Sequence, residues 1–191
     1  MKLADADVSY HPNFFNAREC DFYMQTLRRT VRWRQNKIRF YGKESLVPRL
    51  EAWYGDKGKS YSYSGITMHP DPWTSELNSI KERLEKKCRE RFNSVLINLY
   101  RDGKDRVAWH SDDEKELGNK PTIASISFGE ERKFRFRHKE HDANGLSEEI
   151  VLESGSLLLM RGNTQENWKH EVPKTSRKIG PRINLTFRRI K

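Results

Sequence analysis

The sequence predicts a mainly β fold with flanking helices (α+β), in which the second half of the chain forms an antiparallel sandwich or barrel. From Ser94 onward, short branched or aromatic runs alternate with a period of two and are separated by Gly, Pro, Asn and Asp turns. Before Ser94, two segments instead have apolar residues at helical spacing. We expect all 191 residues to form a single domain, with helices and loops in residues 1–93 and the β core in residues 94–191.

The first helix is predicted within FFNARECDFYMQTLRRTVRW, whose last turn is basic, as is favourable at a helix C-terminus. Its apolar side would carry Phe15, Phe22, Leu27 and Val31. Short strand signals and turns follow to about Met68. A second helix is predicted to begin at Asp71 and Pro72, because aspartate is a common N-cap and proline suits the first turn. Its buried side would carry Leu77, Ile80, Leu84 and Cys88.

Strands of the β core are expected in the segments SVLINLYR, TIASISF, KFRFRH, EIVLE, SLLLMRG and RINLTFR. The chain is basic, with 37 Lys and Arg against 27 Asp and Glu, and 11% of its residues are aromatic. This combination favours a polyanion as partner, nucleic acid before a membrane surface.

The sequence shows no sign of a membrane or secretory segment. No apolar run approaches the roughly 20 residues that cross a bilayer, and the N-terminal stretch carries Asp5 and Asp7 in place of an apolar signal segment. The two cysteines, Cys20 and Cys88, lack the spacing of metal ligands. We therefore expect a soluble intracellular protein with free thiols and no membrane partner.

The segment WHSDDEKELG contains two types of metal ligand at short spacing. On an extended segment, His110 and Asp112 would point to one side, and an imidazole with a carboxylate suits a divalent transition metal. Such pairs arise often by chance, so a third ligand is needed. His170 in NWKHEVP, at the end of a β-type segment, is the best candidate.

Other histidines compete for the position of third ligand. His11 and His69 each precede a proline and have no acidic partner nearby. His138 and His141 in HKEHD are the stronger rivals, but this charged stretch runs into an Asn-Gly pair and is expected to be a solvated hairpin end. Two histidines and one carboxylate form the facial triad of non-haem Fe(II) oxygenases, whereas a structural zinc site would usually require a fourth ligand.

The last predicted strand, RINLTFR, could bind a small dicarboxylate. Alternation places Arg182, Asn184, Thr186 and Arg188 on one face. Guanidinium groups bind carboxylates in a bidentate manner, although an exposed basic edge strand is the alternative interpretation. Asn98 and Tyr100 share a face of the otherwise apolar VLINLY and require polar partners there. The two strands would form two walls of one polar cavity.

With these motifs, the chain resembles the AlkB family of Fe(II)- and 2-oxoglutarate-dependent dioxygenases, most of all its eukaryotic-type DNA-repair demethylases. The similarity runs from about Phe14 to the C-terminus and rests, in order, on VLINLYRDG, HSDDE, IASISFG, FRHK, GSLLLMRG, His170 and PRINLTFR. It implies a double-stranded β-helix, or jelly roll, as the core fold. It also implies an enzyme that uses Fe(II), 2-oxoglutarate and O2 to demethylate bases such as 1-methyladenine and 3-methylcytosine in DNA, releasing formaldehyde and succinate.

Carried onto this sequence, the resemblance makes His110, Asp112 and His170 the iron ligands. Residues that would bind 2-oxoglutarate are Asn98, Tyr100, Arg182, Asn184, Thr186 and Arg188. Arg182 and Tyr100 are expected at its distal carboxylate, and Arg188 nearer the iron-bound end.

The resemblance also places substrate contacts in the first 93 residues, as a nucleotide-recognition lid and a hairpin, because the target base must leave the stack to reach the iron. Tyr61, Ser62 and Tyr63 would line the base pocket, and WYGDKGKSY would be part of the lid. Phe40, Tyr41, Gly42 and Lys43 would form a hairpin that wedges into the duplex, unless the two aromatic residues cover the core. Asp113 and Glu114 would favour a cationic methylated base.

The expected partner is alkylated DNA, single- or double-stranded, bound by a monomer in the nucleus of a eukaryote or otherwise in the cytoplasm. The nearest alternative is the same chemistry on RNA or on single strands, because phosphate and stacking contacts are alike. A non-catalytic nucleic-acid-binding module and a structural zinc protein are alternatives of other classes. The full set of ligands and arginines argues against the first, and the lack of a clear fourth ligand argues against the second.

Overall fold

The computed structural model describes residues 3–40, 43–63, 66–140 and 145–191. In this part of the chain the larger sheet has six strands, in the spatial order β1 (Asp7–His11), β12 (Leu157–Arg161), β9 (Ile123–Gly129), β14 (Arg182–Arg188), β7 (Ser94–Tyr100) and β4 (Leu50–Gly55). The smaller sheet has four strands, in the order β11 (Ser147–Leu152), β10 (Arg132–His138), β13 (Trp168–Val172) and β8 (Val107–His110). All of these neighbours are antiparallel.

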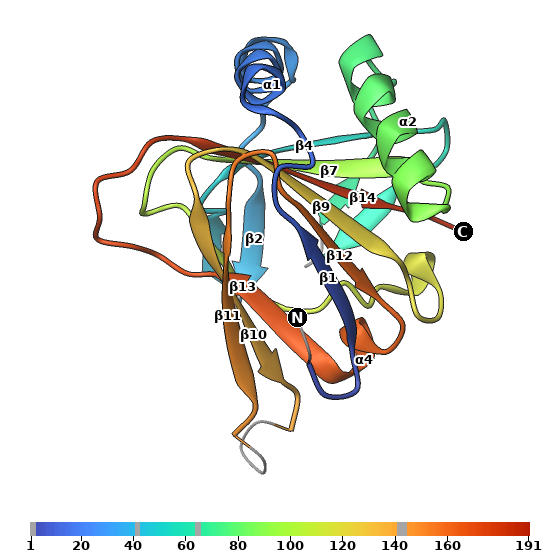
Figure 1. Ribbon diagram of the computed structural model, residues 1–191, viewed down its shortest axis with the longest axis vertical. Coiled ribbons are helices and arrows are strands. Elements are labelled where there is room, and N and C mark those ends of the chain that lie inside the picture. The colour runs from blue at the N-terminus through green and yellow to red at the C-terminus, as the bar shows by residue number, and fades with distance from the viewer. Residues whose placement is uncertain (1–2, 41–42, 64–65, 141–144) are drawn as a thin grey trace.

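Two hairpins stand apart from the larger sheets: β2 (Lys37–Phe40) with β3 (Lys43–Leu46), and β5 (Tyr61–Tyr63) with β6 (Ile66–Met68). The long helices are α1 (Ala17–Thr30) and α2 (Ser75–Cys88), and both lie over the larger sheet on the side away from the smaller one (Figure 1). Short helical turns occur at η1 (Lys115–Leu117) and α4 (Thr164–Asn167). This arrangement agrees with the jelly roll and flanking helices expected from the sequence.

Successive side chains of β14 point to opposite faces of the larger sheet, and both faces are buried. Ile183, Leu185 and Phe187 belong to the apolar core shared with the two long helices. Arg182 and Arg188, together with the polar residues between them, line a cavity on the opposite face, between the two sheets. The strand is buried on both faces, so the predicted alternation is confirmed and the exposed edge strand is ruled out.

Helix α1 is shorter than the segment in which it was predicted, and of the four apolar residues named for it, Phe15, Leu27 and Val31 are buried. Asn16 and Glu19 form a reciprocal capping box that begins the helix. Its buried residues are Cys20 and Leu27, whereas Phe22 is 55% exposed. Phe22 lies about 140° around the helix from Leu27, since each residue turns the helix by about 100°. The prediction that Phe22 lies on the buried side was therefore wrong.

Helix α2 confirms the predicted apolar side, but it begins later than expected. Thr74 is its N-cap and accepts a hydrogen bond from the backbone N–H of Leu77. Asp71, which the sequence suggested as the cap, instead exchanges backbone hydrogen bonds with the end of β4 and pairs with Arg32. The cap was misplaced because Asp71 has a tertiary role that local sequence does not show.

The first 93 residues contribute more than helices and hairpins. They supply β1, which pairs with β12, and β4, which pairs with β7, so the larger sheet crosses the boundary expected at residue 93. Cys20 and Cys88 are both buried and free, as predicted. Among the described residues, no helix is long and apolar enough to cross a membrane.

Candidate active site

Antiparallel pairing of β8 and β13 brings together three side chains that are far apart in sequence. His110 lies directly opposite His170, and their ring centroids are 4.3 Å apart. Asp112 follows the end of β8 by two residues, so its side chain lies close to both rings. One potential ligand atom from each of the three lies within 4.8 Å of the other two. Ligand atoms bonded to one ion at about 2.0–2.2 Å lie about 3–4 Å apart, so these side chains are placed to hold one metal ion.

Hydrogen bonds orient the potential ligands. The Nδ1 of His110 lies 2.8 Å from the carbonyl oxygen of Ala108 and donates to it, which leaves Nε2 for a metal. The backbone N–H of Asp112 donates to Oε1 of Gln165 over 2.9 Å. Ser111 donates from its hydroxyl to the carbonyl of Trp168, which attaches the segment after β8 to β13. The positions of the ligands are therefore fixed by the protein itself.

The electrostatics of the site favour the forms that bind metal. Burial, reinforced by His110, lowers the pKa of His170 to about 3, and burial also lowers the pKa of His110. Burial by itself would raise the pKa of Asp112, but Arg188 and the neighbouring histidines hold that pKa at about 2. At neutral pH the site therefore offers two neutral imidazoles and one carboxylate, which is the donor set that divalent iron accepts.

Arg182 supplies the clearest sign of an anionic ligand. Its guanidinium is 1% exposed, and burial lowers its pKa to about 10, so it stays charged at neutral pH. Nη2 donates to the hydroxyl of Ser127, and the ring of Tyr100 lies 5.2 Å from the guanidinium carbon. Within the described residues, Nε and Nη1 have no hydrogen-bond partner. A buried cation with unused donors is costly unless an anion binds it, and a carboxylate matches its geometry.

Arg188 lies at the metal end of the same strand. Its Nη2 donates to Oδ1 of Asp112 over 2.6 Å, and both side chains are almost completely buried. Along β14, Arg182 lies beside Tyr100 at one end, and Arg188 lies beside the potential metal ligands at the other. Both arginines line the same cavity.

The other predicted polar residues line the cavity, and their hydrogen bonds are made within the protein. Asn184 donates to the hydroxyl of Ser125 and to the carbonyl of Ile126, while Thr186 donates to Oδ1 of Asn184. These bonds satisfy the amide donors of Asn184 without a ligand. We infer that Asn184 and Thr186 shape the wall next to the arginines more than they bind charge.

Sequence reasoning missed one charged residue of the cavity, Arg49. Its side chain donates to Oδ1 of Asn98 and pairs with Glu51, whose carboxylate is fully buried. Arg49 also donates to the backbone carbonyl of Arg106. Nothing in VPR distinguishes this arginine from the many exposed ones, and only the pairing of β4 with β7 brings it to the cavity.

Among the residues proposed to contact substrate, Asp113 lies away from the cavity lining. Its carboxylate pairs with Lys139 over 3.0 Å and borders a separate surface depression. Glu114 is half-buried and precedes η1. This ion pair is solvent-exposed, and a role of Asp113 in attracting a cationic base stays a prediction.

The predicted wedge and base-pocket residues fall on the two hairpins. Phe40 pairs with Lys43 across β2 and β3, which confirms a hairpin, while Tyr41 and Gly42 lie outside the described residues. Tyr61, Ser62 and Tyr63 form β5, and only their backbone is described.

Among the described residues, the group that could hold a metal ion does not include the other histidines considered as third ligand. His138 is not solvated as expected: it is 9% exposed and packs edge-on against the ring of Trp168. His141 lies outside the described residues. His11 lies at the end of β1, and His69 is hydrogen-bonded to Ser60.

Comparisons with known proteins agree with this site. Residues 7–188 match the family model of the 2OG-Fe(II) oxygenase superfamily. The chain is 44% identical over 193 residues to "Alpha-ketoglutarate-dependent dioxygenase alkB homolog 3" of Mus musculus, a match that covers 96% of this chain and 66% of that protein. The corresponding protein of Homo sapiens has the same identity and coverage, so this chain spans slightly less than two thirds of both relatives.

Two further matches concern a second relative and a solved structure. The chain is 40% identical over 198 residues to "DNA oxidative demethylase ALKBH2" of Homo sapiens, covering 100% of this chain and 76% of that protein. It also resembles the structure of OsALKBH1 with a TM-score of 0.62 and 17% identity, covering 98% of this chain and 100% of that one. The structural likeness confirms the jelly-roll fold.

Proposed function

Because the chain belongs to the AlkB family of 2OG-Fe(II) oxygenases, we propose that it oxidatively demethylates N-alkylated bases in DNA. The observation that carries this proposal is the potential metal triad at one end of a cavity that is also lined by Arg182, whose Nε and Nη1 have no hydrogen-bond partner among the described residues. The family uses Fe(II), 2-oxoglutarate and O2, and the residues present fit both the metal and the dicarboxylate. Two of the relatives carry the names "Alpha-ketoglutarate-dependent dioxygenase alkB homolog 3" and "DNA oxidative demethylase ALKBH2".

In this proposal, His110, Asp112 and His170 hold the iron. Arg182 and Tyr100 bind the distal carboxylate of 2-oxoglutarate, and Arg188 positions Asp112 while it faces the iron-bound end. When bound, the metal and cosubstrate supply the oxidising power that hydroxylates an N-methyl group, which then leaves as formaldehyde.

The chain also excludes water and orients the base. Apolar side chains of the cavity lining surround the polar groups and limit the entry of solvent: Leu96, Val107, Phe134, Met160 and Val172. Phe134 also stacks on the ring of His170, with centroids 5.1 Å apart, which restricts the rotation of that imidazole. These contacts keep the potential ligands in place when substrate enters.

Residues 1–93 would supply recognition of the nucleotide and residues 94–191 the catalytic core. We propose that Tyr61, Ser62 and Tyr63 line the pocket for the flipped base and that the β2–β3 hairpin, with Phe40, Tyr41, Gly42 and Lys43, fills the gap it leaves. The favoured lesions are 1-methyladenine and 3-methylcytosine. We expect a monomer that acts where the cell keeps its DNA, the nucleus in a eukaryote.

The test is a panel of methylated single- and double-stranded DNA and RNA oligonucleotides, incubated with Fe(II) and 2-oxoglutarate. The proposal predicts equal amounts of formaldehyde and succinate from methylated DNA and none from unmethylated DNA. The variant Asp112→Asn should lose this activity, whereas Asp21→Asn, an exposed position on α1, should retain it. Turnover of methylated RNA alone would contradict DNA as the substrate.

A further inference from the structure

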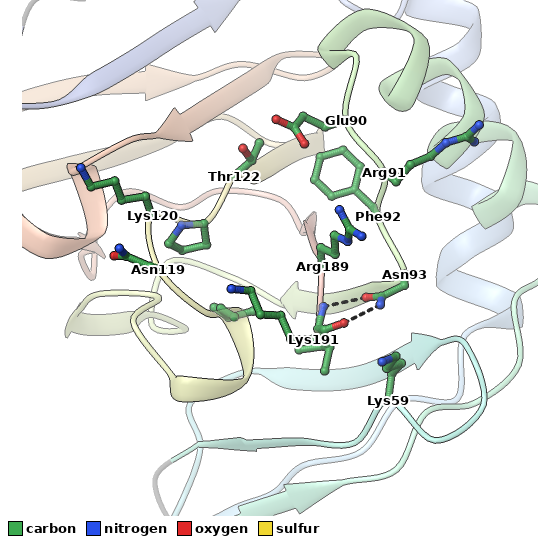
Figure 2. A pocket seen from close by; sticks show the side chains of 13 residues that line it. Lys59, Glu90, Arg91, Phe92, Asn93, Asn119, Lys120, Thr122, Arg189 and Lys191 are labelled. Atoms are coloured by element: carbon green, nitrogen blue, oxygen red, sulfur yellow. Dashed lines mark hydrogen bonds between the residues drawn. The ribbon is translucent and has the colours of Figure 1, made fainter.

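A second pocket lies outside the candidate active site. It has a volume of about 570 Å³, a size that is typical of ligand sites, and opens where the segment after β14 crosses the loops that follow α2 and η1 (Figure 2). Besides Arg91 in the loop after α2, three segments contribute its cations: Lys59 from the loop after β4, Lys120 from the loop before β9, and Arg189 with Lys191 from the segment after β14. None of these residues has a part in the chemistry described above.

The charge of this pocket is strongly unbalanced. Among its described lining residues, Glu90 is the acid, against the four cations and Arg91, which is paired with Glu85. Within the part of the chain that the structure describes, no ion pair occupies Lys59, Lys120 or Arg189. Cations gathered in a concave surface produce a positive potential that concentrates anions. Asn119 and Thr122 add neutral side chains that can donate hydrogen bonds to an anion.

The protein holds the walls of the pocket in place without a ligand. Asn93 donates to the carbonyl of Ile190 and accepts from its backbone N–H, each over 2.7 Å (dashed in Figure 2). The backbone N–H of Lys191 donates to the carbonyl of Glu116 over 2.9 Å, which attaches the same segment to η1. A pocket with fixed walls loses little conformational entropy when a ligand binds.

Along the chain, each of these three segments adjoins a residue or strand assigned to the candidate active site. Arg189 follows Arg188, whose guanidinium is bonded to Asp112. Lys59 precedes β5, the strand proposed to line the base pocket. The loop through Lys120 connects the ligand Asp112 to β9. We take this adjacency along the chain to place the phosphates that flank a bound base on this side of the molecule.

We propose that this basic pocket binds a backbone phosphate of the nucleic-acid strand, close to the nucleotide being repaired. The inference rests on the proposed function only in taking a nucleic acid as substrate. A phosphate group accepts the hydrogen bonds that lysine and arginine donate, and such contacts position a strand without reading its sequence. The phosphate of a free nucleotide has the same chemistry, so the experiment separates the two sources.

The first test measures how the affinity for an unmodified single-stranded oligonucleotide depends on salt. The variant Lys59→Ala/Arg189→Ala should bind more weakly, and the slope of log affinity against log salt should become shallower by about 0.7–1 for each phosphate that the variant no longer neutralises. The control Arg28→Ala/Arg29→Ala makes the same change in net charge on exposed positions of α1. Equal slopes for the pocket variant and this control would overturn the proposal.

The second test identifies the phosphate. Oligonucleotides with one neutral methylphosphonate linkage are compared at each position around a methylated base. The wild-type protein should lose affinity at a linkage near that base, and the pocket variant should lose none there. Binding of AMP or inorganic phosphate that is abolished in the variant, with oligonucleotide binding equal in both proteins, would assign the pocket to a free ligand and contradict the backbone contact.

These readouts are independent of turnover. If the wild-type protein releases no formaldehyde but the pocket variant still shows the shallower salt slope, the proposed function fails and the phosphate site remains. If the wild-type protein demethylates DNA and the pocket variant binds like its control, the phosphate site fails and the proposed function remains.

Discussion

Arg182 shows how a single side chain can indicate a ligand. A cation that is 1% exposed and has two donors without partners in the described structure is unfavourable in the free protein. The surrounding fold is stable enough to keep it there, and its guanidinium is ready to bind a carboxylate. Burying this cation without an anion costs free energy, and a bound carboxylate removes that cost, which strengthens binding of the ligand.

The substitution Arg182→Met should therefore have opposite effects on folding and on binding. The affinity for 2-oxoglutarate should fall by about 10- to 150-fold, because charge-assisted hydrogen bonds contribute about 1.5–3 kcal/mol. The free energy of unfolding of the ligand-free protein should stay the same or rise, because a buried unpaired charge is removed. Urea denaturation with and without 2-oxoglutarate measures both. Stabilisation by 2-oxoglutarate that equals that of the wild type would contradict the assignment.

The buried histidine His170 makes the stability of the metal-free protein depend on pH. Its pKa is about 3 in the folded protein and about 6.5 when unfolded, so the unfolded state binds more protons between these values. The free energy of unfolding should therefore fall as the pH drops below about 6.5, by up to about 1.4 kcal/mol per pH unit. Denaturation of wild type and His170→Gln between pH 7 and pH 5 tests this. The variant should show a shallower slope, and equal slopes would refute the prediction.

At the scale of single residues, the sequence predicted the alternating polar residues of β14, because a buried strand with arginines on one face is chemically unusual. It did not predict Arg49, which reaches the cavity only through tertiary pairing. It did not predict the pairing of Asp113 with Lys139, which is 26 residues away in the chain. Residues whose role depends on a distant partner cannot be read from local pattern.

At the scale of elements, Glu85 shows how α2 is joined to the rest of the fold. Its carboxylate is 8% exposed, accepts a hydrogen bond from the backbone N–H of Phe92 over 2.8 Å, and pairs with Lys81 and Arg91. These bonds stabilise the turn between the helix and β7, which also forms one wall of the basic pocket.

Replacing this carboxylate should destabilise the protein. We expect Glu85→Ala to lower the free energy of unfolding by about 2–3 kcal/mol, because the buried backbone N–H of Phe92 and the half-buried Lys81 lose their acceptor. The exposed neighbour Glu82→Ala on the same helix should change it by less than about 0.5 kcal/mol. Urea denaturation of the two variants provides the comparison, and equal losses would show that Glu85 has no special structural role.

The β2–β3 hairpin carries a prediction about substrate form. If its turn enters the gap that a flipped base leaves, Phe40→Ala with Tyr41→Ala should reduce turnover on duplex DNA more than on single strands. The ratio of kcat/KM for the two substrates measures this, and Phe22→Ala, an exposed aromatic residue on α1, is the matched control. Losses of the same size on both substrates would contradict the proposed insertion of this hairpin into duplex DNA.

The element boundaries were predicted best where the pattern was regular. The strands of the second half and both long helices are present close to their predicted positions. The start of α2 was misplaced. Strands β1 and β4 were not assigned to the main sheet, because their membership depends on strands far away in the sequence. Local pattern gives the period of an element but not its partners.

For the whole molecule, the sequence predicted a β core with helices outside it, and the structure confirms this. The pairing of β8 with β13 and of β14 with β7 could not be predicted from spacing, and these pairings create the cavity. The family resemblance supplied the long-range information that residue patterns lack. Net charge pointed to a polyanion, but only the fold gathers cations at one pocket.

The most direct test of the whole account is anaerobic titration of the protein with Fe(II), or with Co(II) as a spectroscopic substitute. The account predicts one ion per chain, and a spectral change on adding 2-oxoglutarate that Arg182→Met weakens. His170→Ala should lose stoichiometric binding while its circular dichroism spectrum stays that of the wild type. An unchanged metal affinity in His170→Ala would contradict the claim that these three side chains hold the catalytic metal.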